Sequence, residues 1–227
     1  MKYELVKTDT KTAPNGTILY RVRYPASCEL GGWIESEKNL SQTGNARVSG
    51  SARVYGNARV SGDARVSGSA WVYGNARVSG DAWVYDDAQV SGNARVSGDA
   101  RVSGNAWVSG NARVSGSARV SGDAWVDGDA RVPGDARVSG NAWVSGNARV
   151  SGDANILTIG PIGSRGATLT VCTDSKLGVR YSTGCFSGSR EKFLAKVETE
   201  HGDNEHGNAY AAAVLLADHL VKPYTGD

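Results

Sequence analysis

The chain has 227 residues, and its 25 Lys and Arg against 23 Asp and Glu leave a formal net charge of +2, which by itself indicates no class of partner. Its three cysteines, Cys28, Cys172 and Cys185, are odd in number and lack the spacing of a metal site, so they favour reduced thiols over disulfides. There is no apolar run long enough to span a membrane, and Met1 begins no signal peptide, so we expect no membrane partner and a cytoplasmic location.

The first residues predict a small β-structure. Residues 2–6 and 17–24 have the composition of strands, and Pro14-Asn15-Gly16 between them has the chemistry of a turn. We expect residues 1–43 to form a β-hairpin cap that covers the open end of the structure that follows.

Residues 44–155 repeat one six-residue phrase without interruption, for example Asn-Ala-Arg-Val-Ser-Gly at 57–62. Ala and Val lie two positions apart, so both face the same side of a short strand while the residue between them faces outward. Gly with Asn, Asp or Ser forms the corner. A single phrase cannot bury its Ala and Val, but stacked coils can, so the repeat predicts a β-solenoid.

The outward residues form three columns when every third phrase is compared. The Arg face consists of Arg59, Arg77, Arg95, Arg113, Arg131 and Arg149. The Trp face consists of Arg53, Trp71, Gln89, Trp107, Trp125 and Trp143. The mixed face consists of Arg47, Arg65, Trp83, Arg101, Arg119 and Arg137. This period of 18 residues predicts a triangular prism of about six coils, with like side chains stacked ~4.8 Å apart. Asp86 replaces a corner Gly and Pro133 replaces a Ser, so we expect local bends there.

The phrase places a small residue four positions after each aliphatic residue, as in Val48 to Ala52 and Val54 to Ala58. This spacing resembles the hexapeptide repeat of left-handed β-helix proteins, and the resemblance implies a left-handed parallel β-helix. Many members of that superfamily are trimeric acyltransferases that use a His and a loop interrupting the coil. The repeat here contains no His, Lys, Cys or Glu and no insertion, so we expect no enzymatic activity from it.

The segment before the repeat, Leu-Gly-Gly-Trp-Ile-Glu-Ser-Glu-Lys-Asn-Leu-Ser at 30–41, resembles the entry module of bacteriophage and prophage repeat proteins. Those proteins are often labelled polymer-forming and have no settled function. The resemblance covers about residues 1–155. It implies a phage or prophage origin and a location in the host cytoplasm.

The periodicity ends after Asp153, and residues 156–227 predict an α+β module. We expect strands at 156–159, 168–173 and 178–182 and helices at 190–200 and 208–221, the first helix capped by Ser187 or Ser189. The module resembles a small module of phage proteins of unknown role. In those proteins a Gly-Ser-Arg turn, a Thr-Gly-Cys-Phe-x-Gly segment (here 183–188) and a His-Gly-Asp-Asn-x-His segment (here 201–206) recur. The module could cap the solenoid, mediate trimerisation or bind a ligand.

The Arg face is the first candidate binding site. Its preceding corner residues are mainly Asn, with Asp only at Asp129, whereas the mixed face has Asp63, Asp81, Asp99 and Asp135 available to pair with its Arg. An unpaired row of guanidinium groups suits phosphate, sulfate or carboxylate. Alternatively, the Arg side chains stack on one another and only solubilise the surface.

The Trp face, with Tyr73 close by, predicts an exposed aromatic stripe. Such a stripe indicates self-association, with a homotrimer favoured, or stacking on bases or sugars, or a structural ladder without a partner.

Three further residues or groups in the C-terminal module carry possible chemistry. Arg165 in its Gly-rich turn could bind an anion or lie in a plain turn. His201, Asp203 and His206 could bind a metal, or cap a helix and pair with neighbouring carboxylates. Cys185 is predicted to be a buried thiol.

Together these features predict a non-enzymatic, phage-type binding protein without a cofactor. Its ligand would be a nucleotide, including a host defence signal that it sequesters, or another polyanion, bound on the Arg- and Trp-lined surface or in a cleft between subunits. The alternative is a structural, self-assembling trimeric rod or adaptor without a small-molecule ligand. A third interpretation places an enzyme in the C-terminal module, with His201, Asp203, His206 and Arg165 as its functional residues.

Overall fold

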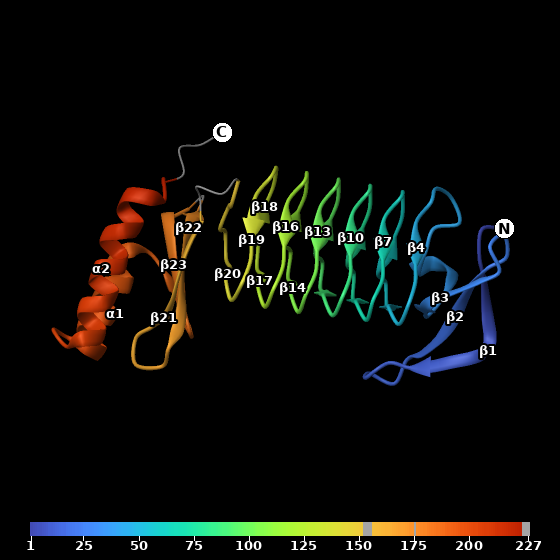
Figure 1. The fold of residues 1–227 in the computed structure, drawn as a ribbon, viewed down its shortest axis with the longest axis horizontal. Coiled ribbons are helices and arrows are strands. Elements are labelled where there is room, and N and C mark those ends of the chain that lie inside the picture. The colour runs from blue at the N-terminus through green and yellow to red at the C-terminus, as the bar shows by residue number, and fades with distance from the viewer. Residues whose placement is uncertain (152–155, 175, 224–227) are drawn as a thin grey trace.

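The computed structural model describes residues 1–151, 156–174 and 176–223. Figure 1 shows three parts along one axis: an N-terminal group of strands, a stack of coils and a C-terminal module of a sheet and two helices. The coils form a parallel β-solenoid of about six turns, as the period of 18 residues predicts. The left-handed sense of the coil is still a prediction, which rests on the resemblance to left-handed β-helix proteins.

The phrase folds into a solenoid because its inward residues fill a continuous core and its backbone pairs with the next coil. Ala94 and Val96 are fully buried, as are their equivalents in the other coils. The backbone N–H of Arg95 donates to the carbonyl oxygen of Ala112 at 2.9 Å, and that of Ser97 donates to Val114 at 3.0 Å. Each coil therefore rests on its neighbour through both its side chains and its backbone.

The two-residue strands of the coils form the three predicted faces. The Arg face contains β6 (Arg59–Val60), β9 (Arg77–Val78), β12 (Arg95–Val96), β15 (Arg113–Val114) and β18 (Arg131–Val132). The Trp face contains β5 (Arg53–Val54), β8 (Trp71–Val72), β11 (Gln89–Val90), β14 (Trp107–Val108), β17 (Trp125–Val126) and β20 (Trp143–Val144). The mixed face contains β4 (Arg47–Val48), β7 (Arg65–Val66), β10 (Trp83–Val84), β13 (Arg101–Val102), β16 (Arg119–Val120) and β19 (Arg137–Val138).

The corners require glycine because they turn through a left-handed conformation and lie directly against the next coil. Gly98 has φ of 69°, and a Cβ atom built on it would lie 3.0 Å from the backbone N of Gly116. Asp86 adopts a φ of 58° in the place of such a glycine, and its carboxylate accepts a hydrogen bond from the backbone N–H of Gly104.

The predicted bends at Asp86 and Pro133 are wrong. Trp83 still pairs in register with Arg101, and Arg131 pairs with Arg113. The coil stays regular at Asp86 because Asp tolerates the left-handed conformation better than most residues.

The N-terminal strands continue the Trp face. The predicted hairpin consists of β1 (Glu4–Thr12) and β2 (Ile18–Tyr24). A third strand that was not predicted, β3 (Glu29–Ile34), pairs with β2 on one side and with β5 on the other. A 3-10 helix follows at Glu37–Asn39. Tyr3 is fully buried at the open end of the solenoid core, so this region closes that end.

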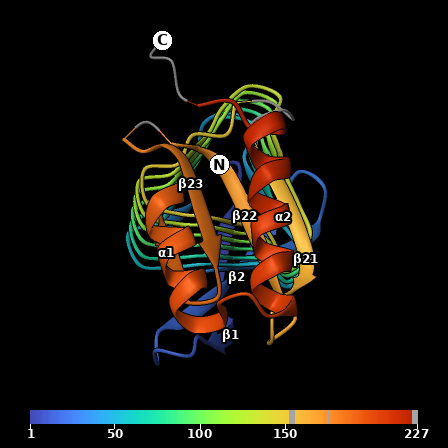
Figure 2. The ribbon, with the colours of Figure 1, turned by 90° about the vertical axis from the view of Figure 1, so that its left-hand side faces the viewer.

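The C-terminal module begins with a four-stranded antiparallel sheet, in the order β21 (Ile156–Ile162), β22 (Ala167–Asp174), β23 (Gly178–Thr183) and β24 (Phe186–Gly188). Helices α1 (Arg190–His201) and α2 (Glu205–Leu220) cover its outer face (Figure 2). Every predicted strand and helix of the module is present, and β24 is additional. Ser189 caps α1, and it is one of the two capping residues that the sequence predicts.

The inner face of this sheet closes the other end of the solenoid. Cys172 is fully buried in the solenoid core, and burial raises the pKa of its thiol to about 12. Thr170 accepts a hydrogen bond from the backbone N–H of Trp143 at 3.0 Å. At the edge of the contact, Arg180 pairs with the buried carboxylate of Asp174 at 2.6 Å. Of the three roles considered for the module, these contacts establish that of a cap.

Within the described ranges, no helix is long and apolar enough to cross a membrane.

Candidate functional site

The Arg face presents a straight row of guanidinium-bearing side chains. Arg95 pairs in register with Arg77 on one side and with Arg113 on the other, at the ~4.8 Å spacing of neighbouring strands. Across the described ranges, no ion pair involves the five exposed members of this row, Arg59, Arg77, Arg95, Arg113 and Arg131. Arg149, the predicted sixth member, is half-buried beside the C-terminal sheet, and its backbone N–H donates to Thr173.

Asparagine side chains form a ladder along the corner between the Trp face and the Arg face. The Nδ2 of Asn75 donates to the Oδ1 of Asn93 at 3.0 Å, and Asn93 donates in the same way to Asn111 at 3.1 Å. The ladder begins at Asn57 and ends on the carboxylate of Asp129. Each amide has two N–H groups and uses one in the ladder, so the second is available to a ligand beside the Arg row.

The opposite corner of the Arg face carries the acidic side chains that were predicted to pair with the mixed face. That prediction is wrong: in the part of the chain that the structure describes, Asp63, Asp81, Asp99 and Asp135 form no ion pair with the mixed-face Arg. Asp63 instead accepts hydrogen bonds from Asn45. Arg65 and Arg101 lie over the ring of Trp83, at 5.3 and 5.8 Å from its centre. The acidic corner therefore lowers the positive potential along one edge of the Arg face.

The aromatic stripe on the Trp face is shorter than predicted, because both ends of the solenoid are covered. Trp71 packs against the buried cluster of Ala13, Leu19, Trp33 and Tyr55. The guanidinium of Arg53 lies 4.6 Å from its ring centre. Trp143 is half-buried next to Thr170 of the C-terminal sheet. The exposed remainder is Trp107 and Trp125.

Trp107 and Trp125 stack on neighbouring coils. Their ring centres are 5.0 Å apart and their planes differ by 12°. They are 36% and 46% exposed, respectively, although stacking covers one face of each ring. This pair is an apolar patch on the Trp face of the solenoid.

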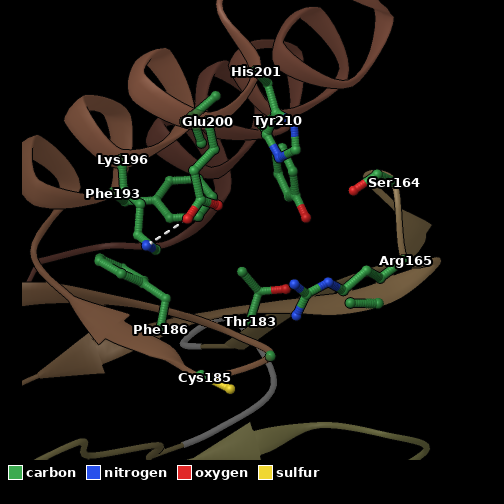
Figure 3. Close-up of a pocket in the computed structure, with 13 residues that line it drawn as sticks. Ser164, Arg165, Thr183, Cys185, Phe186, Phe193, Lys196, Glu200, His201 and Tyr210 are labelled. Carbon is green, nitrogen blue, oxygen red and sulfur yellow. Dashed lines mark hydrogen bonds and ion pairs between the residues drawn. The ribbon is translucent and has the colours of Figure 1, made fainter.

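A pocket of about 500 Å³ lies in the C-terminal module, between the helices and two turns of the sheet. It brings together three segments that the sequence had singled out separately: Arg165 from the Gly-rich turn, Cys185 from 183–188 and His201 from 201–206 (Figure 3). Cys185 was predicted to be buried, and that prediction is wrong. It lies in the turn between β23 and β24, where the alternation of the strands no longer directs a side chain inward.

The pocket also contains residues that sequence reasoning missed. Lys196 pairs with Glu200 one helical turn away at 2.6 Å, and this hydrogen bond lowers the pKa of the Glu200 carboxyl. Tyr210 from α2 stacks on His201 with their ring centres 5.8 Å apart. Thr183 contributes a hydroxyl from the end of β23. These residues are far apart in the sequence and follow no motif, so no local signal could have identified them.

The His-rich segment serves as a helix connection. Asn204 caps α2 by accepting hydrogen bonds from the backbone N–H groups of His206 and Gly207. The rings of His201 and His206 lie 5.8 Å apart. Among the described residues, no group of three or more His, Cys, Asp or Glu side chains is placed to hold a metal ion.

Three parallel sheets wound into one coil, with Gly corners every six residues, define this chain as a β-solenoid repeat protein. The family model of the YdcK beta solenoid repeat matches seven segments of it: 52–68, 58–73, 70–86, 88–104, 94–110, 106–122 and 130–146. These matches all lie within the repeat and show that it is a β-solenoid repeat.

Among curated proteins, none matches this sequence. Among solved structures, the acetyltransferase domain of PglB from Neisseria gonorrhoeae FA1090 is similar, with 16% identity and a TM-score of 0.38 over 56% of this chain and 58% of that domain. The same domain in complex with acetyl coenzyme A has 16% identity and a TM-score of 0.30, over 52% of this chain and 59% of that domain. The chain thus spans less than two thirds of the length of the PglB domain in either structure.

Proposed function

We propose that this protein binds a linear polyanion along its Arg face. The observation that carries the proposal is the in-register row of exposed arginines, which in the described ranges has no carboxylate partner. Guanidinium groups at strand spacing repel one another unless anions or water intervene. A ligand whose negative charges repeat along its length would relieve that repulsion in several coils at once.

The geometry favours a chain of phosphates over a single small anion. The row from Arg59 to Arg131 covers four coil spacings, about 19 Å in all. Guanidinium groups bind phosphate oxygens through two parallel N–H donors, and the second N–H of each ladder Asn adds a donor beside them. Single-stranded nucleic acid and inorganic polyphosphate both have this character. A mononucleotide, the other predicted ligand, would contact only one or two of these arginines.

The proposed role is binding without catalysis. The repeat contains no His, Lys, Cys or Glu that could act as a general base or nucleophile beside the arginines. A phage setting and the sequestration of a host defence signal are further predictions, and they rest on the sequence resemblance.

The test compares two double variants that remove the same charge from two different faces of the solenoid. Arg95→Gln with Arg113→Gln changes the Arg face, whereas Arg119→Gln with Arg137→Gln makes the same change on the mixed face. Affinity for a fluorescent single-stranded oligonucleotide and for polyphosphate is measured by anisotropy at several salt concentrations. The Arg-face variant should bind about tenfold more weakly. Its slope of log affinity against log salt should fall by about 1.4 for the oligonucleotide.

The mixed-face variant should keep most of the affinity and the salt slope. Equal losses in the two variants would show that binding follows net charge alone and would contradict a site on the Arg face. An absence of binding by the unchanged protein at low salt would also contradict the proposal.

A second candidate function is self-association through the exposed Trp107 and Trp125. Trp side chains are enriched where protein interfaces derive most of their energy, and a stacked pair offers a flat apolar surface to a second copy. We propose a homotrimer as the assembly. Sedimentation velocity should then show a trimer that dissociates when Trp107 and Trp125 are replaced by Ser. A monomer at all concentrations would contradict this role.

A further inference from the structure

We infer that the pocket of the C-terminal module is a second binding site, which takes a small organic anion with an aromatic body. This site lies on a different module from the Arg face and takes a different class of ligand. The inference therefore does not depend on the proposed polyanion binding.

Arg165 supplies the positive end of the pocket. Its guanidinium projects into the hollow from the turn between β21 and β22 (Figure 3). In the ranges that the structure describes, it forms no ion pair. The turn lies tightly against α2, because a Cβ atom built on Gly163 would be only 2.3 Å from the hydroxyl oxygen of Tyr210. Glycine at this position thus lets the turn that carries Arg165 lie directly against that hydroxyl.

Hydroxyl groups surround the same space. The Oγ1 of Thr183 is buried and has no hydrogen-bond partner among the described residues, an arrangement that costs free energy unless a ligand satisfies it. The hydroxyl groups of Ser164 and Tyr210 also point into the hollow (Figure 3). A carboxylate or phosphate could accept hydrogen bonds from these hydroxyls together with the guanidinium.

The other side of the pocket is apolar. Phe186 and Phe193 lie with ring centres 5.4 Å apart, and Val197 extends this wall along α1. Aromatic rings pack well against such a surface. A volume of about 500 Å³ is in the range of small-molecule sites, which combine apolar walls with a few convergent polar groups.

The charges of the lining favour an anion over a cation. Arg165 and Lys196 each carry one positive charge, and Glu200 carries one negative charge that is already paired with Lys196. Arg165 is therefore the cation left for a ligand, and it would repel an ammonium group. The site accordingly selects an aromatic carboxylate or phosphate monoester against an aromatic amine of the same size.

The test titrates the full-length protein with four probes: benzoate, phenyl phosphate, inorganic phosphate and benzylamine. Binding is followed by calorimetry and by NMR. We expect benzoate or phenyl phosphate to bind, inorganic phosphate to bind more weakly for lack of a ring, and benzylamine not to bind. Whichever of benzoate and phenyl phosphate binds more tightly shows whether the site prefers a carboxylate or a phosphate. Binding by neither of them, or equal binding of benzylamine, would overturn the inference.

Two variants connect the binding to these residues. Arg165→Gln should weaken the better probe by roughly tenfold or more, while Lys192→Gln, which removes a charge from α1 outside the pocket, should leave it unchanged. Oligonucleotide binding on the Arg face should not respond to Arg165→Gln. If this variant weakens the oligonucleotide but not the aromatic anion, the pocket assignment is overturned.

Thr183→Val separates a binding role from a structural one. It removes the unpartnered hydroxyl and keeps the shape, so the melting temperature without ligand should stay the same or rise. The affinity for the aromatic anion should fall by roughly three- to tenfold. A lower melting temperature with unchanged affinity would show that the hydroxyl serves the fold, and would overturn its assignment to the ligand.

Discussion

The solenoid and the C-terminal module build their candidate sites in opposite ways. In the solenoid, the position within a six-residue phrase decides whether a side chain is buried, exposed or at a corner, so chemistry is repeated along straight columns such as the Arg face. In the module, single residues from separate turns and helices meet once, around a pocket. A repeat therefore provides an extended surface for an extended ligand, whereas a non-repetitive fold provides a concavity for a compact one.

The two regions also differ in how they are stabilised. One hydrophobic core runs through the solenoid from Tyr3 to Cys172, whereas the module has a separate core around Phe193 and Tyr210. At the junction between them, Arg180 pairs with the carboxylate of Asp174, whose side chain is fully buried. Substitutions at the junction, in the coils and on the surface should therefore have effects of graded size.

The largest effect is expected from Arg180→Gln at the junction. Asp174 is fully buried, so loss of its partner leaves a poorly compensated charge and should lower the free energy of unfolding by about 3 kcal/mol. Urea denaturation followed by circular dichroism measures the change. The control is Arg190→Gln, which breaks the half-exposed pair with Asp218 and should cost less than about 1 kcal/mol. Equal costs would show that burial of Asp174 does not determine the cost of losing its partner.

The next effect compares two corner glycines of the solenoid. Gly98 and Gly140 have φ of 69° and 64°, so Ala at either position is strained by about 1 to 2 kcal/mol. A Cβ atom on Gly98 would also press on the backbone of Gly116, whereas no described residue lies within 4 Å of one on Gly140. Gly98→Ala should therefore cost about 1 kcal/mol more than Gly140→Ala. The same loss of stability in both variants would mean that contact with the next coil does not contribute to the requirement for glycine.

The sequence predicted the parts of this structure that depend on short-range pattern. The spacing of Ala, Val and Gly determines the coil, and the period of 18 residues determines three faces with their columns. Local signals such as the cap at Ser189 placed both helices. Strand β3 was not predicted because it is stabilised by pairing with β2 and β5, and its own sequence does not reveal that pairing.

The parts that the sequence could not predict depend on contacts between distant residues. The stripe on the Trp face is shortened because Trp71 packs against a cluster that contains Ala13 and Leu19 of the N-terminal region. The pocket was missed because Arg165 and His201 are 36 positions apart, and no periodicity connects them. Arginines in columns can be counted from the sequence, but which ones stack on Trp83 depends on side-chain geometry.

Replacing Asp86, which occupies a glycine corner, should change the stability by less than the two glycine variants and in the opposite direction. It adopts a φ of 58° where the other coils have glycine, and its carboxylate recovers part of the strain by accepting a hydrogen bond from Gly104. Asp86→Gly removes both the strain and the hydrogen bond, so the solenoid should become more stable by about 0.5 kcal/mol. Thermal unfolding measures the change. A loss of stability would show that the hydrogen bond outweighs the strain.

The smallest effect concerns Asp127 on the Trp face. Burial raises the pKa of its carboxyl above the ordinary 3.8, although a hydrogen bond from the indole N–H of Trp143 opposes the shift. A carboxyl with a raised pKa in the folded state favours folding below its ordinary pKa, and this contribution is lost as the pH rises through the folded value. At pH 7, Asp127→Asn should therefore raise the free energy of unfolding by about 0.5 kcal/mol or less. The gain should shrink toward zero as the pH falls below 3.8. The contrast is with Asp129, whose carboxylate ends the Asn ladder and accepts from Asn111. If both Asn variants show the same pH profile, burial at Asp127 is not the cause.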